Sequence, residues 1–224
     1  MLGLSFDLPP GLYNAFQKLL HGDYENAGGA IGAMKSQYPG RALELGCGTG
    51  IFSRFFEPGM YVGVDLDSGR VDLAKELQPE HEFISGDVTA LDPLWLTDFG
   101  FVFCYGVMHH IDDAGINRIL GAFDRASAVA GKPIHFLVME PVMPEKTLLN
   151  IPGWMLGKLD RGNYVRKLSR LKALFADRVS KVEDVAAHWY WPIPGVNMVV
   201  ECPTISSQVG RENEEVLKRA SAHA

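Results

Sequence analysis

Glycines and acidic side chains that could bind a nucleoside-like ligand follow one another at regular spacing in the first half of the chain. Gly46, Gly48 and Gly50 stand two residues apart in the run ALELGCGTGIF. An acidic residue, Asp65, follows Gly46 by 19 positions, and Asp87 stands in the later run GDV. Because a glycine has no β-carbon, such a turn can bend sharply and let a ligand touch the main chain.

The two aspartates suit different parts of a nucleoside. About 20 residues after a glycine turn, a carboxylate can accept hydrogen bonds from both hydroxyls of a ribose, so Asp65 predicts a ligand without a 2′-phosphate. Asp87 can accept a hydrogen bond from the exocyclic amine of an adenine. Glu44, beside the turn, would repel phosphates and suits a ligand with an ammonium group and a positively charged sulfur.

The spacing of the glycines disfavours a dinucleotide. The dinucleotide fingerprint requires a third glycine or alanine at position 51, where this chain has Ile51. Together with Glu44, this counts against a nicotinamide-dependent oxidoreductase. A tight loop that binds no ligand is the simplest alternative for the glycine turn, and each aspartate taken singly could be a solvated or capping residue.

A parallel sheet would bring these residues together. From residue 41 onward, short apolar strands alternate with helices, a pattern typical of crossover connections between parallel strands. Strands are predicted at residues 42–45, 60–65, 81–87, 99–106 and 133–140, and helices at 49–56, 68–77 and 112–130. Asp112 or Asp113 is placed to cap the last of these helices. Ligands bind at the carboxyl ends of such strands, where the glycine turn and both aspartates would meet.

The length of 224 residues suits one α/β domain with additions. The predicted parts are an N-terminal helical cap at 1–40 with helices at 12–20 and 24–38, a core at 41–204 with a lid insertion at about 142–176, and a loosely ordered polar tail at 205–224. Each part follows from a change in composition or in periodicity of the chain.

The lid and the last strands follow the fifth predicted strand. Residues 141–160 are rich in Pro, Met and Gly and are predicted as a loop with a short helix. A helix over residues 163–176 would place Tyr164, Leu168, Leu171 and Phe175 on one stripe. Two strands, near 182–191 and 196–202, are predicted as an antiparallel pair at the edge of the sheet.

Four runs, ELGCGTG, GVDLD, GDVTAL and YGVMHHI, occur in an order and spacing that resembles the class I S-adenosylmethionine-dependent methyltransferase family. The resemblance covers residues 41–141, and the last two strands match the family's reversed edge hairpin more loosely. It implies an α/β, doubly wound, mostly parallel seven-stranded sheet with an antiparallel edge hairpin, the Rossmann-like methyltransferase fold. It also implies S-adenosyl-L-methionine as the cofactor.

The resemblance assigns a part of the cofactor to each run. It implies that the methionine part is surrounded by Glu44, Gly46, Cys47, Gly48 and Gly50, the ribose held by Asp65 and Leu66, the adenine by Asp87 and Val88, and the methyl-donor side lined by Tyr105, Gly106 and Val107. The first two helices would close over the cofactor.

His109 and His110 follow the fourth predicted strand and are the candidate catalytic residues. An imidazole near its ordinary pKa is a common general base, and one of the pair could orient or deprotonate an oxygen or nitrogen of the substrate. A structural role for at least one of them is the alternative. No third and fourth ligand stand at a spacing that would suggest a metal site.

Other polar and aromatic residues are ambiguous. Glu140 could reach the substrate cleft or cap the loop after the fifth strand. Eight basic and two acidic residues lie between residues 158 and 181, and they could attract a phosphate or carboxylate of the acceptor, although an amphipathic helix with a solvated basic face is favoured. The aromatic residues Trp154, Trp189, Tyr190 and Trp191 could line an acceptor pocket, while core packing is expected for at least two of them.

The composition is that of a folded, water-soluble domain, with 47% hydrophobic and 21% charged residues and a net charge of −6. A negative balance argues against a general nucleic-acid partner. Neither a membrane span nor a signal peptide is predicted, which leads to the expectation of a cytoplasmic protein. Cys47, Cys104 and Cys202 have no paired spacing and are expected as small packing residues.

These features predict a methyltransferase that acts on a small-molecule acceptor by in-line transfer. Acidic, sugar-like and lipid-like acceptors stay open, as does methylation at oxygen, nitrogen, carbon or sulfur. A base is needed only for a hydroxyl acceptor. A non-catalytic module that binds S-adenosylmethionine or S-adenosylhomocysteine is the alternative, against which the intact stretch 105–111 counts.

Overall fold

The structure is a computed structural model that describes residues 24–145, 150–151, 154–155, 162–185 and 194–202. The first predicted helix, the predicted tail, most of the predicted loop 141–160 and Trp189, Tyr190 and Trp191 lie outside the described residues. The predicted division of the chain at residues 40 and 204 stays a prediction.

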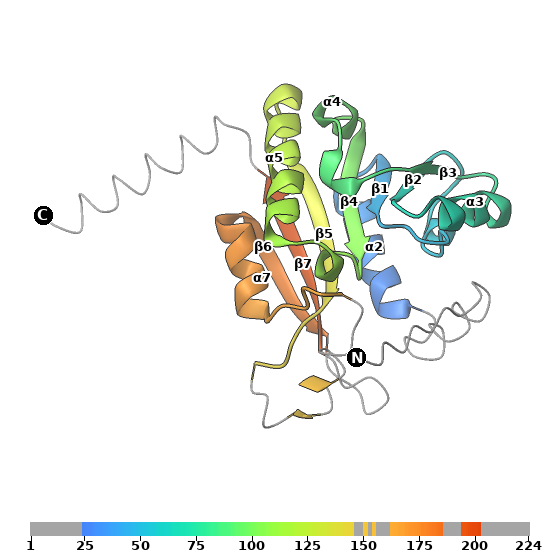
Figure 1. Ribbon diagram of the computed structural model, residues 1–224. Coiled ribbons are helices and arrows are strands. Elements are labelled where there is room, and N and C mark those ends of the chain that lie inside the picture. Colours follow the sequence, from blue (N-terminus) through green and yellow to red (C-terminus); the bar gives the residue numbers. More distant parts are fainter. Residues whose placement is uncertain (1–23, 146–149, 152–153, 156–161, 186–193, 203–224) are drawn as a thin grey trace, which may run out of the picture.

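A seven-stranded sheet forms the centre of the molecule (Figure 1), in the order β3-β2-β1-β4-β5-β7-β6. The strands are β1 (Arg41–Leu45), β2 (Tyr61–Asp65), β3 (Glu82–Ser85), β4 (Phe99–Tyr105), β5 (Ile134–Pro141), β6 (Val179–Val185) and β7 (Gly195–Cys202). The first five are parallel to one another, and β7 pairs antiparallel with both β5 and β6. The predicted mostly parallel sheet with a reversed edge hairpin is confirmed. The strand order reverses between β1 and β4, which places a binding crevice at their carboxyl ends.

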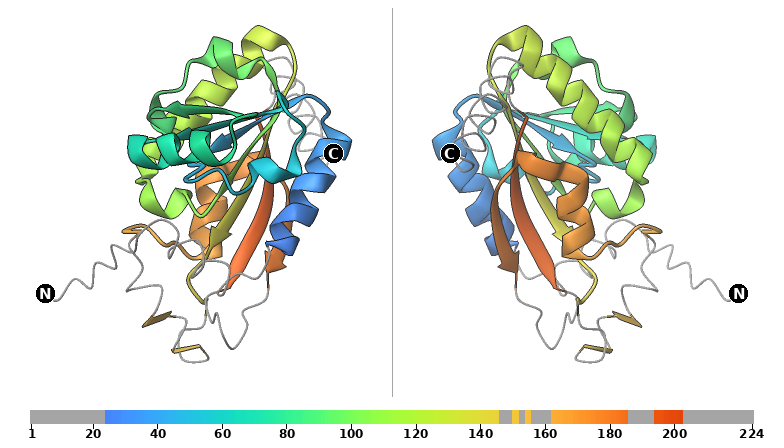
Figure 2. Two further views of the ribbon diagram at one scale, coloured as in Figure 1. Left: turned by 90° about the vertical axis from the view of Figure 1, so that its right-hand side faces the viewer. Right: turned by 90° about the vertical axis from the view of Figure 1, so that its left-hand side faces the viewer.

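Helices cover both faces of the sheet (Figure 2). On one face α2 (Glu25–Gln37) and α3 (Ser68–Leu77) pack over a cluster that includes Ile31, Phe101 and Phe103; on the other, α4 (Pro93–Leu96), α5 (Asp113–Ala130) and α7 (Leu168–Phe175) pack over a second cluster that includes Leu43, Phe123 and Phe136. The three cysteines are buried, as expected. Burial on both faces is what the apolar strands predict.

The ends of α5 are fixed by the residues that the sequence indicates. Of the two candidate caps, Asp112 is the N-cap, and its Oδ1 accepts a hydrogen bond from the backbone N–H of Gly115 at 2.7 Å. The helix ends at Gly131, whose φ of 64° is left-handed. These caps hold the helix in a fixed position behind the turn that follows β4.

The helix predicted at residues 49–56 is wrong. Gly50 has a left-handed φ of 76°, and a single 3₁₀ turn, η1 (Ser53–Phe55), is all that forms before the extended Phe56. Pro58 disfavours a helical conformation for the residue before it, so the turn cannot lengthen. The chain therefore passes from β1 to β2 without an α-helix, and all residues of this connection are described.

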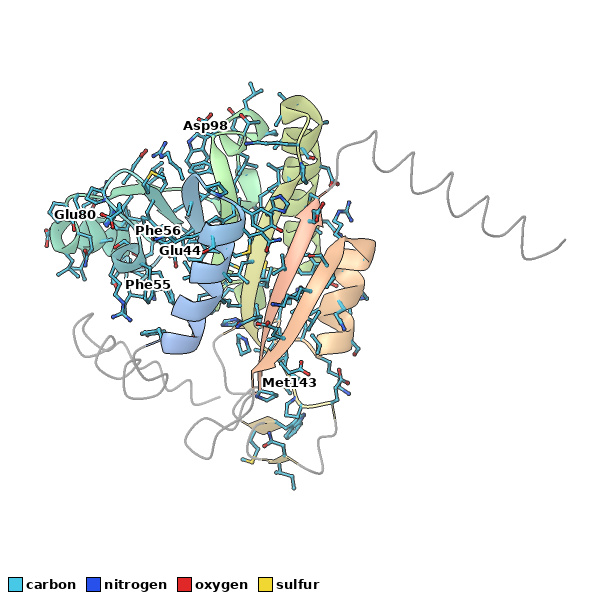
Figure 3. All side chains as sticks on the ribbon, turned by 180° about the vertical axis from the view of Figure 1, so that it is seen from behind. Glu44, Phe55, Phe56, Glu80, Asp98 and Met143 are labelled. Carbon is cyan, nitrogen blue, oxygen red and sulfur yellow. The ribbon has the colours of Figure 1, made fainter. Side chains whose placement is uncertain are left out.

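The predicted helix 163–176 begins five residues later, at Leu168. The described residues before it, 162–167, are not helical: residues 163 and 164 form a turn, and Lys167 is extended and bridged to Met143. Met143 lies at the lower end of the sheet in Figure 3. Leu171 and Phe175 are buried as predicted, but Tyr164 lies outside the helix and is 41% exposed. The strand predicted near 182–191 begins earlier than expected, since β6 starts at Val179, and the rest of the predicted range, residues 186–193, includes none of the described residues.

Candidate active site

The glycine turn after β1 forms one wall of the crevice. Gly46, Gly48 and Gly50 all have left-handed φ values, of 72°, 54° and 76°. A β-carbon on Gly46 would lie 2.4 Å from Cγ2 of Val107, so a glycine there allows the turns after β1 and β4 to pack together. A β-carbon on Gly48 would meet no atom of the described residues within 4 Å. The backbone at Gly48 is therefore open on the side where a ligand could approach.

Asp65, at the end of β2, is tied to this turn. Its Oδ2 accepts a hydrogen bond from the backbone N–H of Gly48 at 2.8 Å, and its Oδ1 accepts one from the N–H of Asp67 at 2.9 Å. Each carboxylate oxygen has two lone pairs, so one on each remains for a pair of hydroxyls. The carboxylate is thus oriented beside the glycine turn before any ligand binds.

The residues that follow β2 and β3 offer apolar and acidic surface. Leu66 is 76% exposed although it is a large apolar residue. Asp87 is exposed, and its Oδ1 accepts a hydrogen bond from the N–H of Thr89 at 2.8 Å, which leaves Oδ2 toward solvent. Val88 is half-buried. Asp87 also borders a shallow hollow with apolar walls from Ile84, Leu91 and Trp95, among others.

Glu44 lies beneath the glycine turn, on the sheet face that α2 covers (Figure 3). Its carboxyl is 1% exposed and accepts a hydrogen bond from the hydroxyl of Tyr61. Burial raises the pKa of Glu44 well above its usual range, and the nearby Asp65 adds to the rise. The same burial raises the pKa of the Cys47 thiol. The structure thus buries a carboxyl that the sequence suggested as a contact for a positive ligand, and it favours the protonated form.

The turn after β4, residues 107–111, forms the opposite wall and is called the base turn below. The backbone N–H groups of Val107 and Met108 both donate to Oε1 of Glu140, at 2.6 Å each. Oε2 of the same carboxylate lies 2.8 Å from Nδ1 of His109. The side chains of His109 and Glu140 are 9% and 2% exposed. Glu140 neither caps the loop after β5 nor points into an open cleft, because the base turn occupies both of its oxygens.

The two histidines differ in their surroundings. His109 is buried, whereas His110 is exposed, and their ring centroids lie 4.1 Å apart. Nε2 of His109 lies on the ring edge between Cε1 and Cδ2. Cε1 is 3.5 Å from a β-carbon built on Gly106, and Cδ2 is 2.0 Å from one built on Gly162. The ring of His109 therefore packs between the backbones of these two glycines.

Tyr105 belongs to an aromatic group that the sequence did not reveal. Its ring centroid lies 5.1 Å from that of Phe52 and 5.7 Å from that of Tyr24, which precedes α2. Tyr24 has a left-handed φ of 58°, which is uncommon for a bulky residue. Phe52 stands two residues after Gly50 in an apolar run, which is a weak signal, and no sequence signal singles out Tyr24.

The basic stretch of residues 158–181 is partly internal. Arg166 is 8% exposed on its side chain and bonds to the base turn and to Asp113. Arg170, 61% exposed, also pairs with Asp113. Trp154 is 37% exposed. Arg166 therefore does not belong to a solvated basic face.

Among the described residues, no group of three or more His, Cys, Asp or Glu side chains is arranged to hold a metal ion. In the same part of the chain, no helix has the length and apolar character that crossing a membrane requires.

The residues that form the glycine turn and the base turn are similar in sequence to known methyltransferases. Residues 42–131 match the family model described as a methyltransferase domain. The malonyl-[acyl-carrier protein] O-methyltransferase of Serratia marcescens is 36% identical over 87 residues, which are 38% of this chain and 32% of that protein. The chain thus matches about a third of the length of this relative.

Solved structures share the fold over most of the chain. Magnesium protoporphyrin IX methyltransferase from Synechocystis PCC 6803, solved with bound SAH, superposes with a TM-score of 0.58 at 17% identity over 83% of this chain and 86% of that one. An S-adenosylmethionine-dependent methyltransferase of Methanosarcina mazei superposes with a TM-score of 0.57 at 16% identity over 75% and 94%. Residues 42–131 therefore match a methyltransferase domain, and the fold around them is that of the solved S-adenosylmethionine-dependent methyltransferases.

Proposed function

We propose that this protein methylates a hydroxyl group of a small molecule, with S-adenosylmethionine as the methyl donor and His109 as the general base. The observation that carries the proposal is the contact of 2.8 Å between Nδ1 of the buried His109 and the carboxylate of Glu140. His110, which is exposed, is not part of this assignment.

The residues of the crevice fit the cofactor. The open backbone at Gly48 and the oriented carboxylate of Asp65 suit the methionine part and the two ribose hydroxyls, and Leu66, Asp87 and Val88 would flank the base. Gly46, Cys47 and Gly50 complete the turn, and Tyr105, Gly106 and Val107 line the side opposite to it. When bound, S-adenosylmethionine supplies a methyl group on a positively charged sulfur, which an aligned acceptor takes up by in-line displacement.

The partner of Nδ1 decides what Nε2 of His109 can do. An ionised carboxylate accepts hydrogen bonds and donates none, so Nδ1 carries the proton of the neutral ring and the basic lone pair is on Nε2. Cε1, the ring atom next to Nε2, lies 3.5 Å from a β-carbon built on Gly106, the residue after β4. A hydroxyl of the acceptor held there could pass its proton to Nε2 as its oxygen takes up the methyl group.

The chemistry of the acceptor follows from the need for such a base. A free amine has its own lone pair, and a thiolate or a carboxylate is already ionised, so none of them requires proton removal at neutral pH. An alcohol or a phenol does. A buried and oriented His–Glu pair therefore favours a hydroxyl acceptor, and the low exposure of the His109 side chain, 9%, favours a small molecule over a folded protein.

Binding and turnover measured on two variants test the proposal. In His109→Gln we expect calorimetric affinity for S-adenosylhomocysteine to be unchanged and methyl transfer to a hydroxyl acceptor, found by screening alcohols and phenols with radiolabelled cofactor, to fall about 100-fold or more. His110→Gln is the matched control and should retain turnover. Full activity of His109→Gln would show that this ring is not the base.

A further inference from the structure

Arg166 holds the base turn from the side opposite to Glu140. A guanidinium has five N–H donors, and all five are used here. Nε and Nη2 donate to Oδ1 of Asp113 at 2.9 and 2.7 Å, and Nη2 also donates to the carbonyl of Ile111 at 2.7 Å. Nη1 donates to the carbonyls of Met108 and Tyr164, at 2.8 and 3.1 Å. No donor remains for a substrate, so Arg166 acts inside the protein.

The carbonyls that Arg166 binds flank the two histidines. Met108 and Ile111 are the residues immediately before and after them. The carboxylate of Glu140 binds the N–H groups at the start of the same turn, and Arg166 binds its carbonyls. An anion on the amide side and a cation on the carbonyl side hold the short 3₁₀ turn η3 (Met108–His110) from both sides.

The segment that carries Arg166 makes further contacts with the base turn. The N–H of Tyr164 donates to the carbonyl of His109 at 3.0 Å, and the backbone of Gly162 lies against the His109 ring, with no room for a β-carbon. The N–H of Met143 donates to the carbonyl of Arg166 at 2.8 Å. Residues 162–167 therefore cross from the end of β5 to the base turn as one connected segment (Figure 1).

We propose that Arg166 is a positioning residue for His109: its planar guanidinium fixes the backbone of the base turn, and thereby the imidazole, relative to Glu140. This inference rests on the proposed function of His109. A lysine has the same charge, but its ammonium group lacks the planar arrangement of N–H donors that lets a guanidinium bond to Met108, Ile111 and Asp113 at once. The geometry of the guanidinium, in addition to its charge, is what the site requires.

The test reads the His109 ring directly, in the full chain without cofactor or acceptor. Long-range ¹H–¹⁵N spectra of ¹⁵N-histidine protein report which ring nitrogen carries the proton, and His109→Gln assigns the signals. We expect the wild type to carry the proton on Nδ1. In Arg166→Met and in Arg166→Lys we expect a mixture of the two tautomers. Where an acceptor is available, kcat should fall about 10- to 100-fold, with affinity for S-adenosylhomocysteine unchanged.

Arg170→Met is the matched control. Arg170 also bonds to Asp113, at 2.5 Å, but among the described contacts it does not reach the base turn, so its loss should leave the His109 signals as in the wild type. Arg166→Lys keeps the charge and guards against an Arg166→Met variant that does not fold. Wild-type signals in Arg166→Lys would overturn the proposal, as would equal changes in Arg166→Met and Arg170→Met. If His109→Gln retains turnover, the proposed function fails, while the spectra still decide the role of Arg166.

Discussion

The two walls of the crevice are built in different ways. The glycine turn is held by Asp65, which bonds to Gly48 from 17 positions along the chain. The base turn is held by Glu140, 31 to 33 positions away, and by Arg166, 55 to 58 positions away. One wall therefore depends on neighbouring strand ends, and the other depends on the completed fold.

This difference separates binding from transfer. Changes in the glycine wall should alter affinity for the cofactor, whereas changes in the base-turn wall should alter the transfer step. The comparison predicts that variants fall into two classes with little overlap.

Glu140→Gln should give the largest loss of kcat. The amide oxygen of glutamine can still accept hydrogen bonds from the N–H groups of Val107 and Met108. The side chain no longer carries the negative charge that keeps the proton on Nδ1 of His109, whether its oxygen or its nitrogen faces that atom. We expect kcat to fall about 100- to 10,000-fold with affinity for S-adenosylhomocysteine unchanged, measured by steady-state kinetics and calorimetry. The exposed Glu145, changed in the same way, is the control. A loss of cofactor affinity as large as the loss of kcat would contradict the claim that the base-turn wall affects transfer and not cofactor binding.

Asp65→Ala should act on the other wall. It would remove the two proposed hydrogen bonds to ribose hydroxyls as well as the link to Gly48, and we expect affinity for S-adenosylhomocysteine to fall about 100-fold or more. Asp67→Ala, which removes an exposed helix cap, is the matched control and should bind as the wild type. Near-normal binding by Asp65→Ala in calorimetry would refute the pocket assignment.

Gly162→Ala should disturb the base turn without removing a charge. Its β-carbon would lie 2.0 Å from Cδ2 and 2.6 Å from the carbonyl oxygen of His109, so the ring or the segment must move. We expect kcat to fall about tenfold and cofactor affinity to stay the same. Gly121→Ala on α5, where the nearest atom is the end of a flexible arginine at 3.4 Å, should have no effect on kcat. Equal kcat values in the two variants would show that Gly162 does not help to position the base turn.

Glu44→Gln should have the smallest effect, on stability. Burial raises the pKa of Glu44 above its ordinary value of 4.5, so the folded protein holds this proton more tightly than the unfolded chain. The resulting stability is fully present below about pH 4.5 and is lost as the pH rises through the raised pKa. Glutamine can still accept from Tyr61 and needs no proton. We expect Tm to rise by about 2–4 °C at pH 7.5 and to be unchanged at pH 4.5; a lower Tm at pH 7.5 would contradict this.

The sequence predicts the glycine wall and the sheet well, because both depend on local patterns. Alternation of strands and helices, the cap at Asp112 and the spacing from Gly46 to Asp65 are each set within a short stretch of chain. The prediction of a helix after the glycine turn is wrong because left-handed glycines and Pro58 allow only a single 3₁₀ turn to form there.

The base-turn wall could be predicted in part. His109 is recognisable by its place after β4, but its difference from His110 comes from the fold, which buries one ring and exposes the other. In the sequence, Arg166 resembles any residue of a solvated basic helix. Its role depends on the non-helical residues 162–167, which precede α7 because this helix begins five residues later than predicted. Contacts across more than 50 positions leave no local pattern.

Calorimetric titration of the wild-type chain with S-adenosylhomocysteine, with Asp65→Ala beside it, tests the central claim most directly. The account predicts micromolar binding at one site per chain and its loss in the variant. No binding by the folded wild type would contradict a formed cofactor site at the glycine turn, and with it the assignment of the opposite wall to methyl transfer.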